Sequence, residues 1–139
     1  YFIFGLHENY VSKSVLDIIK KIEDRVRYNT YDSVNIRREK DFDTEMTNAL
    51  EFINNDFFGL EIDLDAIPNI ASSAMTLSGY SIEQVRQFIS FFAKNKNAAY
   101  LHICEGAPDL GEEKNNHLIG KLIGYLITDF IKANSTAVN

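Results

Sequence analysis

The sequence predicts an α/β fold with a mainly parallel sheet. Apolar runs typical of buried strands alternate with segments of helical period along the whole chain, and this alternation is the pattern of βαβ units. With 139 residues, of which 45% are hydrophobic and 24% charged, the chain has the size and composition of one globular domain. Four strands and four helices can be placed in order.

The first βαβ unit begins at the start of the chain. A strand is expected over residues 1–6, and a second, short strand over residues 26–31. Between them, residues 14–24 carry apolar side chains at spacings of three and four, which is typical of one buried helix face. These side chains are Val15, Ile18, Ile19 and Ile22. We therefore expect a helix that packs on the sheet.

A charged loop leads to the second helix and the third strand. Asp41 or Asp43 can cap this helix, because aspartate side chains accept hydrogen bonds from the first helical N–H groups. Its apolar side is formed by Phe42, Met46, Ala49, Leu50 and Ile53. The third strand is expected over residues 57–65, apolar where it is buried and acidic where it ends.

A long loop follows, over residues 66–80. It is rich in Ser, Pro, Asn and Gly, and loops of this length in compact domains usually line a site. Ser81 with Gln84 three positions later is a capping-box pattern, which predicts that the third helix begins there. The fourth strand is expected over residues 98–105.

The two ends of the chain differ in character. The last helix is expected over residues 116–132, followed by a polar, frayed tail over residues 133–139. The other end opens directly on the apolar strand YFIFGL, without an initiating Met. We therefore expect a chain cut in mid-protein.

Composition argues against several classes of protein. The formal charge is −6, and Lys and Arg are scattered, so we do not expect nucleic-acid binding. The single Cys104 cannot form an intrachain disulfide, which fits a reducing compartment. No apolar run reaches the roughly 20 residues that span a bilayer, and the start lacks the features of a signal peptide. We expect a cytoplasmic protein with no membrane partner.

Three carboxylates alternate along the third strand. Glu61, Asp63 and Asp65 would lie on one strand face at its carboxyl end, where parallel sheets bind ligands. Carboxylates this close repel each other unless a cation lies between them, and oxygen ligands suit Mn²⁺, Mg²⁺ or Ca²⁺. A solvated acidic face at a sheet edge explains the same pattern equally well.

The fourth strand ends in a second candidate, Glu105. Its carboxylate falls where the strand gives way to a Gly/Pro loop, and it could hold a planar cation such as a guanidinium by paired hydrogen bonds. A carboxylate that faces water is the alternative. We interpret Cys104 as a small buried hydrophobe and His102 as a hydrogen-bonded core or interface residue, since neither has an evident catalytic partner in the sequence.

Two short sequence motifs carry a resemblance to a known family. IDLDAI at residues 62–67 and HICEGAP at residues 102–108, in this order and at this spacing, resemble the ureohydrolase family of arginase, agmatinase and formimidoylglutamase. GYS at residues 79–81 also resembles the Gly-Leu-Thr that opens a helix in that family. The resemblance covers nearly the whole chain. It implies a three-layer α/β/α fold, of which residues 1–139 are the carboxyl-terminal portion of one arginase-like domain.

The resemblance implies a role for each candidate residue. Asp63 and Asp65 would be ligands of two Mn²⁺ ions, whereas Glu61 is not expected to be a ligand. Glu105 would be the catalytic residue that clamps the substrate. Glu8 and Asn9 stand where arginases have an acidic pair that receives the amino group of the substrate, so they are candidates for substrate binding.

The departures from the family limit what this chain can do. The upstream Gly-Gly-x-His and Asp-Ala-His-x-Asp phrases, which supply the other metal ligands, do not occur here, so a complete two-metal site cannot be built. The loop after the first strand lacks the Arg of arginases, which makes formimidoylglutamase-like members the nearer relatives. The expected function is manganese-dependent hydrolysis of a small amidine or guanidine by the intact protein, in a homo-oligomer. The isolated chain is expected to be inactive.

Two other interpretations stay open. The chain could be a non-catalytic α/β homologue or fragment that acts as an interaction module, and the missing ligands favour this for the isolated chain. A flavodoxin-like or receiver-type domain with Mg²⁺ at the strand ends is disfavoured, because no acidic pair follows the first strand and no suitable Lys follows the last.

Overall fold

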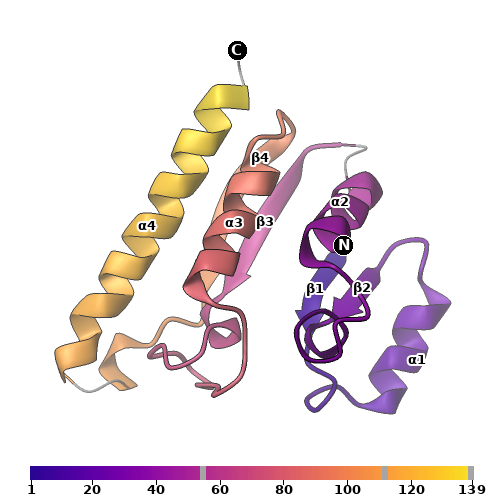
Figure 1. Cartoon of the computed structure of the whole chain (residues 1–139), viewed down its shortest axis with the longest axis horizontal. Helices are drawn as coiled ribbons and strands as arrows, with labels where there is room; N and C mark the ends of the chain where they lie inside the picture. The colour runs from indigo at the N-terminus through magenta and orange to yellow at the C-terminus, as the bar shows by residue number, and fades with distance from the viewer. Residues whose placement is uncertain (54–55, 111–112, 138–139) are drawn as a thin grey trace. The chain divides into compact units, whose positions relative to one another are not determined.

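Strand pairing in this protein is parallel, as the βαβ pattern predicts (Figure 1). The computed structural model describes residues 1–53, 56–110 and 113–137. The chain divides into two compact units, Tyr1–Asp56 and Phe57–Asn139. Each unit holds one parallel strand pair: β1 (Phe2–Leu6) with β2 (Arg27–Thr30), and β3 (Phe58–Asp63) with β4 (Ala98–Cys104). The predicted α/β class is confirmed.

In the first unit, helix α1 (Lys13–Lys21) joins β1 to β2. Ile19 is buried, but Val15, Ile18 and Ile22 are between 37% and 58% exposed, so the expectation that the whole apolar face packs on the sheet is wrong. Of this apolar stripe, Ile19 is the side chain that is shielded from solvent. The helix also ends earlier than predicted, in a tightened turn where Ile22 N–H donates to the Ile19 carbonyl.

The segment after β2 forms a π-helical turn, Asp32–Ile36, where the sequence predicts only a charged loop. Helix α2 (Phe42–Ile53) then begins behind Asp41, whose carboxylate accepts hydrogen bonds from the backbone N–H and the hydroxyl of Thr44, both at 2.9 Å. Asp41 is therefore the cap, rather than Asp43. The core of this unit includes buried Met46 and edge-on aromatic pairs between α2 and β1.

In the second unit, helix α3 (Ile82–Ala93) packs on the strand pair. Its first turn is closed by the predicted capping box of Ser81 and Gln84. Phe92 and Ile89 are at most 1% exposed, and the Phe92 ring meets the Phe58 ring of β3 edge-on at 6.4 Å. The other buried apolar side chains here include Leu60, Ile62, Leu64, Val85, Ile119, Leu122 and Leu126.

Helix α4 (Glu113–Ala137) lies beside α3 and is longer than predicted (Figure 1). The expected frayed tail is wrong as far as Ala137. The hydroxyls of Ser135 and Thr136 donate to the carbonyls of Lys132 and Ala133, so these polar residues are accommodated in the last turn.

A paired hydrogen bond joins α3 to α4. Arg86 donates to both carboxylate oxygens of Asp129, at 2.6 and 3.1 Å, and its guanidinium lies 5.2 Å from the centre of the Tyr125 ring. Asn134 of α4 donates to the carbonyls of Ala93 and Ala98, at 3.3 and 3.1 Å. These contacts fix the two helices over the β3–β4 pair.

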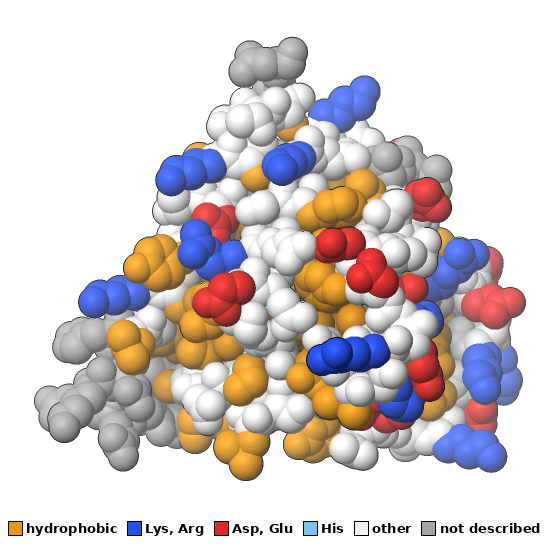
Figure 2. Space-filling model, viewed as in Figure 1, with side chains coloured by type: hydrophobic (Ala, Val, Ile, Leu, Met, Phe, Trp, Pro, Cys, Tyr) orange, Lys and Arg blue, Asp and Glu red, His pale blue; other side chains and the backbone are white. Residues whose placement is uncertain are grey.

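The surface mixes charge and apolar groups (Figure 2). Acidic and basic side chains are interspersed on the face drawn, and apolar side chains reach the surface over α4. The large apolar residues exposed on this helix include Leu118, Tyr125, Ile127 and Ile131. Among the described residues, no helix has the length and apolar character needed to cross a membrane.

Gly79 offers a test of the loop packing in the second unit. A Cβ atom there would lie 2.2 Å from the backbone oxygen of Ala66, so we expect Gly79→Ala to lower the free energy of unfolding by about 1–3 kcal/mol. Gly120 of α4 is the matched control, because a Cβ there meets nothing within 4 Å, and Gly120→Ala should stabilise by about 0.5–1 kcal/mol. Urea unfolding of both variants makes the comparison, and equal midpoints would contradict this packing.

Candidate functional site

The carboxyl ends of β3 and β4 meet at one edge of the second unit. The parallel register places Glu61 opposite His102 and Asp63 opposite Cys104. Glu105 follows directly after β4 and therefore lies at the same edge as Asp63. Asp63 and Glu105, two of the strand-end residues singled out in the sequence, therefore lie at one edge.

Asp65 does not continue the strand, and the expected stack of three carboxylates on one strand face is wrong. Residues Leu64–Ala66 form a single 3-10 turn, capped by Asp63, whose Oδ1 accepts a hydrogen bond of 2.8 Å from the Asp65 N–H. An aspartate that caps a turn in this way ends the strand at its own position. Glu61 turns instead toward His102, with Oε1 3.4 Å from the ring Nδ1.

The loop after β3 is tied to the segment after β4. Ser72 and Gly106 form an antiparallel bridge. On its two sides, Ser73 N–H donates to the Glu105 carbonyl and Ala107 N–H donates to the Ala71 carbonyl, each at 3.0 Å. Glu105 itself has a φ of 63°, a left-handed conformation that side chains other than glycine rarely adopt. The bridge and its two flanking hydrogen bonds therefore hold the backbone of Glu105 in an unfavourable conformation beside the loop.

Ser73 brings two of the predicted carboxylates together. Its Oγ lies 3.1 Å from Asp65 Oδ2 and 2.5 Å from Glu105 Oε2. The other oxygen of Asp65 accepts a hydrogen bond of 2.9 Å from the N–H of Ala74. The sequence marks this Ser-rich loop as one that lines a site, but it does not single out Ser73.

The electrostatics of the two aspartates differ. Partial burial raises the pKa of Asp63, and the nearby charges of Asp65 and Glu105 add to this, although the hydrogen bond from Asp65 N–H opposes it. Burial would also raise the pKa of Asp65, but hydrogen bonds from Ser72, Ala74 and Ser73 outweigh it and leave that pKa below its usual value. Of the two aspartates, Asp63 is thus the one whose negative charge is less compensated.

The carboxylates of Asp63 and Asp65 are the type of ligand that a hard divalent cation binds, but they are too few to form a complete site. Carboxylate oxygens are the donors that Mn²⁺ accepts, and a cation beside Asp63 would offset the repulsion from Asp65 and Glu105. Within the described part of the chain, however, no three His, Cys, Asp or Glu side chains are arranged to hold a metal ion. Asp63 and Asp65 can therefore supply only part of a metal site.

His102 and Cys104 differ from expectation in their surroundings. His102 is exposed, not in the core, and its partner is Glu61. Cys104 is half-buried, and its thiol donates to the Ile62 carbonyl at 3.7 Å. Burial, together with the nearby carboxylates, raises the pKa of this thiol, so it is a poor nucleophile at neutral pH.

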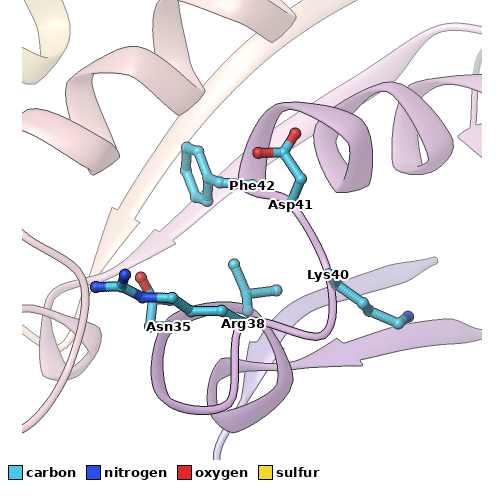
Figure 3. A pocket seen from close by; sticks show the side chains of 6 residues that line it. Asn35, Arg38, Lys40, Asp41 and Phe42 are labelled. Atoms are coloured by element: carbon cyan, nitrogen blue, oxygen red, sulfur yellow. The ribbon is translucent and has the colours of Figure 1, made fainter.

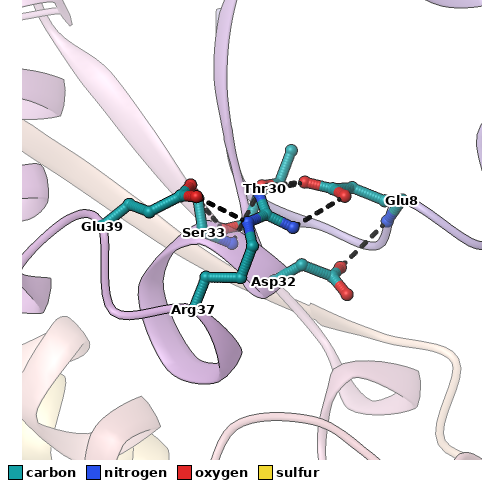
Figure 4. A network of polar contacts seen from close by, with 6 residues as sticks. All are labelled: Glu8, Thr30, Asp32, Ser33, Arg37 and Glu39. Atoms are coloured by element: carbon teal, nitrogen blue, oxygen red, sulfur yellow. Dashed lines mark hydrogen bonds and ion pairs between the residues drawn. The ribbon is translucent and has the colours of Figure 1, made fainter.

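In the first unit, Glu8 takes part in a polar network after β1 (Figure 4). Its carboxylate accepts two hydrogen bonds from the Arg37 guanidinium, at 3.0 and 2.8 Å, and one from Thr30 Oγ1 at 2.8 Å. Arg37 also pairs with Glu39 at 2.9 Å. The pKa of Glu8 falls to about 2, chiefly because of the hydrogen bonds from Arg37 and then Thr30. Asn9, the other predicted substrate residue of this loop, is exposed.

A shallow pocket of about 350 Å³ lies elsewhere in the first unit (Figure 3). Its lining comes from the π-helical turn, the loop after it and the start of α2, and consists of Val34, Asn35, Arg38, Lys40, Asp41 and Phe42. None of the predicted site residues lines it. The predicted residues thus lie in two places: Glu8 and Asn9 in the first unit, and Asp63, Asp65 and Glu105 in the second.

Comparison by sequence finds no relative, since no protein-family model and no curated protein matches the chain. Comparison by structure does. Formimidoylglutamase from Bacillus subtilis subsp. subtilis str. 168 matches 95% of this chain with a TM-score of 0.80 at 20% identity. Formiminoglutamase from Trypanosoma cruzi, in a structure with Mn²⁺, matches 97% with a TM-score of 0.80 at 12% identity. Helicobacter pylori arginase matches 96% with a TM-score of 0.77 at 16% identity.

The matched regions are parts of longer proteins. They amount to 41%, 44% and 42% of the three solved chains, so this chain spans about two fifths of their length. Identities this low establish the fold and leave the activity to be tested. The chain therefore has the α/β fold of these formimidoylglutamase and arginase structures, over part of their length.

Proposed function

We propose that the intact protein carrying this chain is a manganese-dependent hydrolase of linear amidines or guanidines, with formimidoylglutamase-like chemistry. The observation that carries the proposal is the meeting of Asp63, Asp65 and Glu105 at the carboxyl ends of β3 and β4. The fold adds support, because formimidoylglutamases and arginases share it. A T. cruzi neighbour whose structure includes Mn²⁺ supports the choice of metal.

Asp63 and Asp65 would hold the metal in this proposal. Bound Mn²⁺ would supply an activated water at neutral pH. Asp63 would supply a carboxylate at the sheet edge, where the nearby charges of Asp65 and Glu105 favour a bound cation. Asp65 is already held by Ser73 and the Ala74 N–H, so its carboxylate is pre-oriented. The remaining ligands would come from outside this chain.

Glu105 would bind and orient the substrate. Its carboxylate lies at the same edge, with one oxygen in contact with Ser73, and a planar amidinium or guanidinium can engage a carboxylate through two parallel hydrogen bonds. Such a contact holds the carbon to be attacked in a fixed position, which is a major source of rate enhancement. The constrained backbone of Glu105 would keep its carboxylate in one orientation.

Glu8 and Asn9 are proposed as further substrate contacts. A carboxylate has about four acceptor positions, and Arg37 and Thr30 already use three of those on Glu8. Glu8 therefore has about one position left for a substrate amino group. Its larger contribution in this proposal is to hold the loop after β1, whereas Asn9 is exposed and open to contact.

The rival proposal is a non-catalytic α/β module. It is favoured by the lack of a three-ligand metal group within the described residues. The two proposals differ in one measurement: the metal content and turnover of the intact protein. Purified with Mn²⁺, it should bind the metal and hydrolyse one of formiminoglutamate, arginine and agmatine. A protein that holds no metal and turns over none of the three is a structural homologue.

The aspartates provide the first test by mutation. Asp63→Asn and Asp65→Asn each remove a charged metal ligand, so Mn²⁺-dependent turnover by the intact protein should fall to background. Glu61→Gln is the matched control, because Glu61 lies on the same strand but faces His102, and its turnover should stay at the wild-type level. Activity is measured as kcat/KM. Retained activity in either aspartate variant would contradict the assignment of Asp63 and Asp65 as metal ligands.

The Glu8 network predicts a pH dependence. Because the folded pKa of Glu8 is about 2 against an ordinary value of 4.5, its contribution to stability is present above pH 4.5 and is lost as the pH falls toward 2. Carboxyl-detected NMR should show Glu8 titrating near pH 2, and Arg37→Gln should move that midpoint upward. Glu39→Gln is the control, since it leaves both Arg37 hydrogen bonds to Glu8 in place. A wild-type midpoint near 4.5 would mean that the network does not persist in solution.

A further inference from the structure

Ser73 makes a contact pattern that the proposed roles of Asp65 and Glu105 do not explain. A hydroxyl has one hydrogen to donate, yet Ser73 Oγ lies within hydrogen-bond distance of two carboxylates, at 3.1 Å from Asp65 and 2.5 Å from Glu105. The nearby Ser72 hydroxyl is buried and contacts the Ile70 carbonyl and Asp65. The Ser73 hydroxyl is the donor that Asp65 and Glu105 share.

The backbone around Ser73 fixes the position of that donor. The Ser73 N–H donates to the Glu105 carbonyl at 3.0 Å, and the next residue, Ala74, donates its N–H to Asp65 at 2.9 Å. The antiparallel bridge between Ser72 and Gly106 joins the two segments on the other side. Ser73 is thus bound to Glu105 through both backbone and side chain, while its neighbour is bound to Asp65.

We propose that Ser73 is a positioning residue that sets the carboxylates of Asp65 and Glu105 relative to each other. This inference rests on the proposed function, in which Asp65 holds metal and Glu105 holds substrate. A single hydroxyl between them would link the two tasks, because it lies within hydrogen-bond distance of both carboxylates. The residue touches neither reacting group directly and acts only through the two carboxylates.

The first measurement needs no metal. Carboxyl-carbon NMR shifts of Asp65 and Glu105 are compared in the intact wild-type protein and in Ser73→Ala, Ser73→Thr and Ser78→Ala. We expect both shifts to change in Ser73→Ala and to return in Ser73→Thr, which restores the hydroxyl. Ser78→Ala is the control, because Ser78 is exposed in the same loop and its contacts with Thr76 run through its backbone.

The second measurement is the affinity for Mn²⁺ by isothermal titration. Ser73→Ala should weaken binding by about 10–100-fold, as is usual when a group that orients a metal ligand is lost, with Ser73→Thr and Ser78→Ala close to wild type. Unchanged shifts and affinity in Ser73→Ala, or an equal loss in Ser78→Ala, would overturn the inference. If the wild-type protein binds no Mn²⁺, the proposed function fails, and the metal-free NMR comparison alone decides the role of Ser73.

Discussion

The parallel register of β3 and β4 is the constraint on which the candidate site depends. Because Asp63 pairs with Cys104, the residue that follows β4 reaches the same edge as the residue that ends β3. A slip of one residue would turn every side chain of a strand to the other face and separate these carboxylates. The register is held by the apolar face of the strands, where Leu60 and Ile62 are buried in the core that α3 and α4 complete. The chemistry at the edge is therefore fixed by packing on the opposite face.

Gathering carboxylates at that edge costs free energy, and the structure offsets the cost unevenly. Asp65 accepts hydrogen bonds at both of its oxygens, so its pKa lies below the usual value, whereas Asp63 caps a turn through one oxygen and its pKa is raised. The two aspartates, two residues apart, thus differ in how far hydrogen bonds offset burial and repulsion.

Much of the fold could be predicted because its signals are local. Asp41 and the pair Ser81 and Gln84 cap their helices through contacts within one turn, and both positions are visible in the sequence. The residues that the sequence could not place depend on distant partners. Ser73 meets Glu105 across 32 positions, and the strand ends before Asp65 because a capping side chain outweighs alternation of polarity. The sequence also did not reveal where α4 ends. The hydroxyls of Ser135 and Thr136 donate to carbonyls of the same helix, so these polar residues do not end it.

The pairing of β3 with β4 also bears on the order in which the second unit folds. Glu61 and His102 face each other across the strand pair but lie 41 positions apart in the chain. Closing a loop of that length costs chain entropy before any pairing compensates for it, whereas α3 with its capping box needs only contacts between near neighbours. We therefore expect α3 to form early and the carboxylate edge to form late. During synthesis on the ribosome, the edge can be completed only after the whole of β4 has emerged.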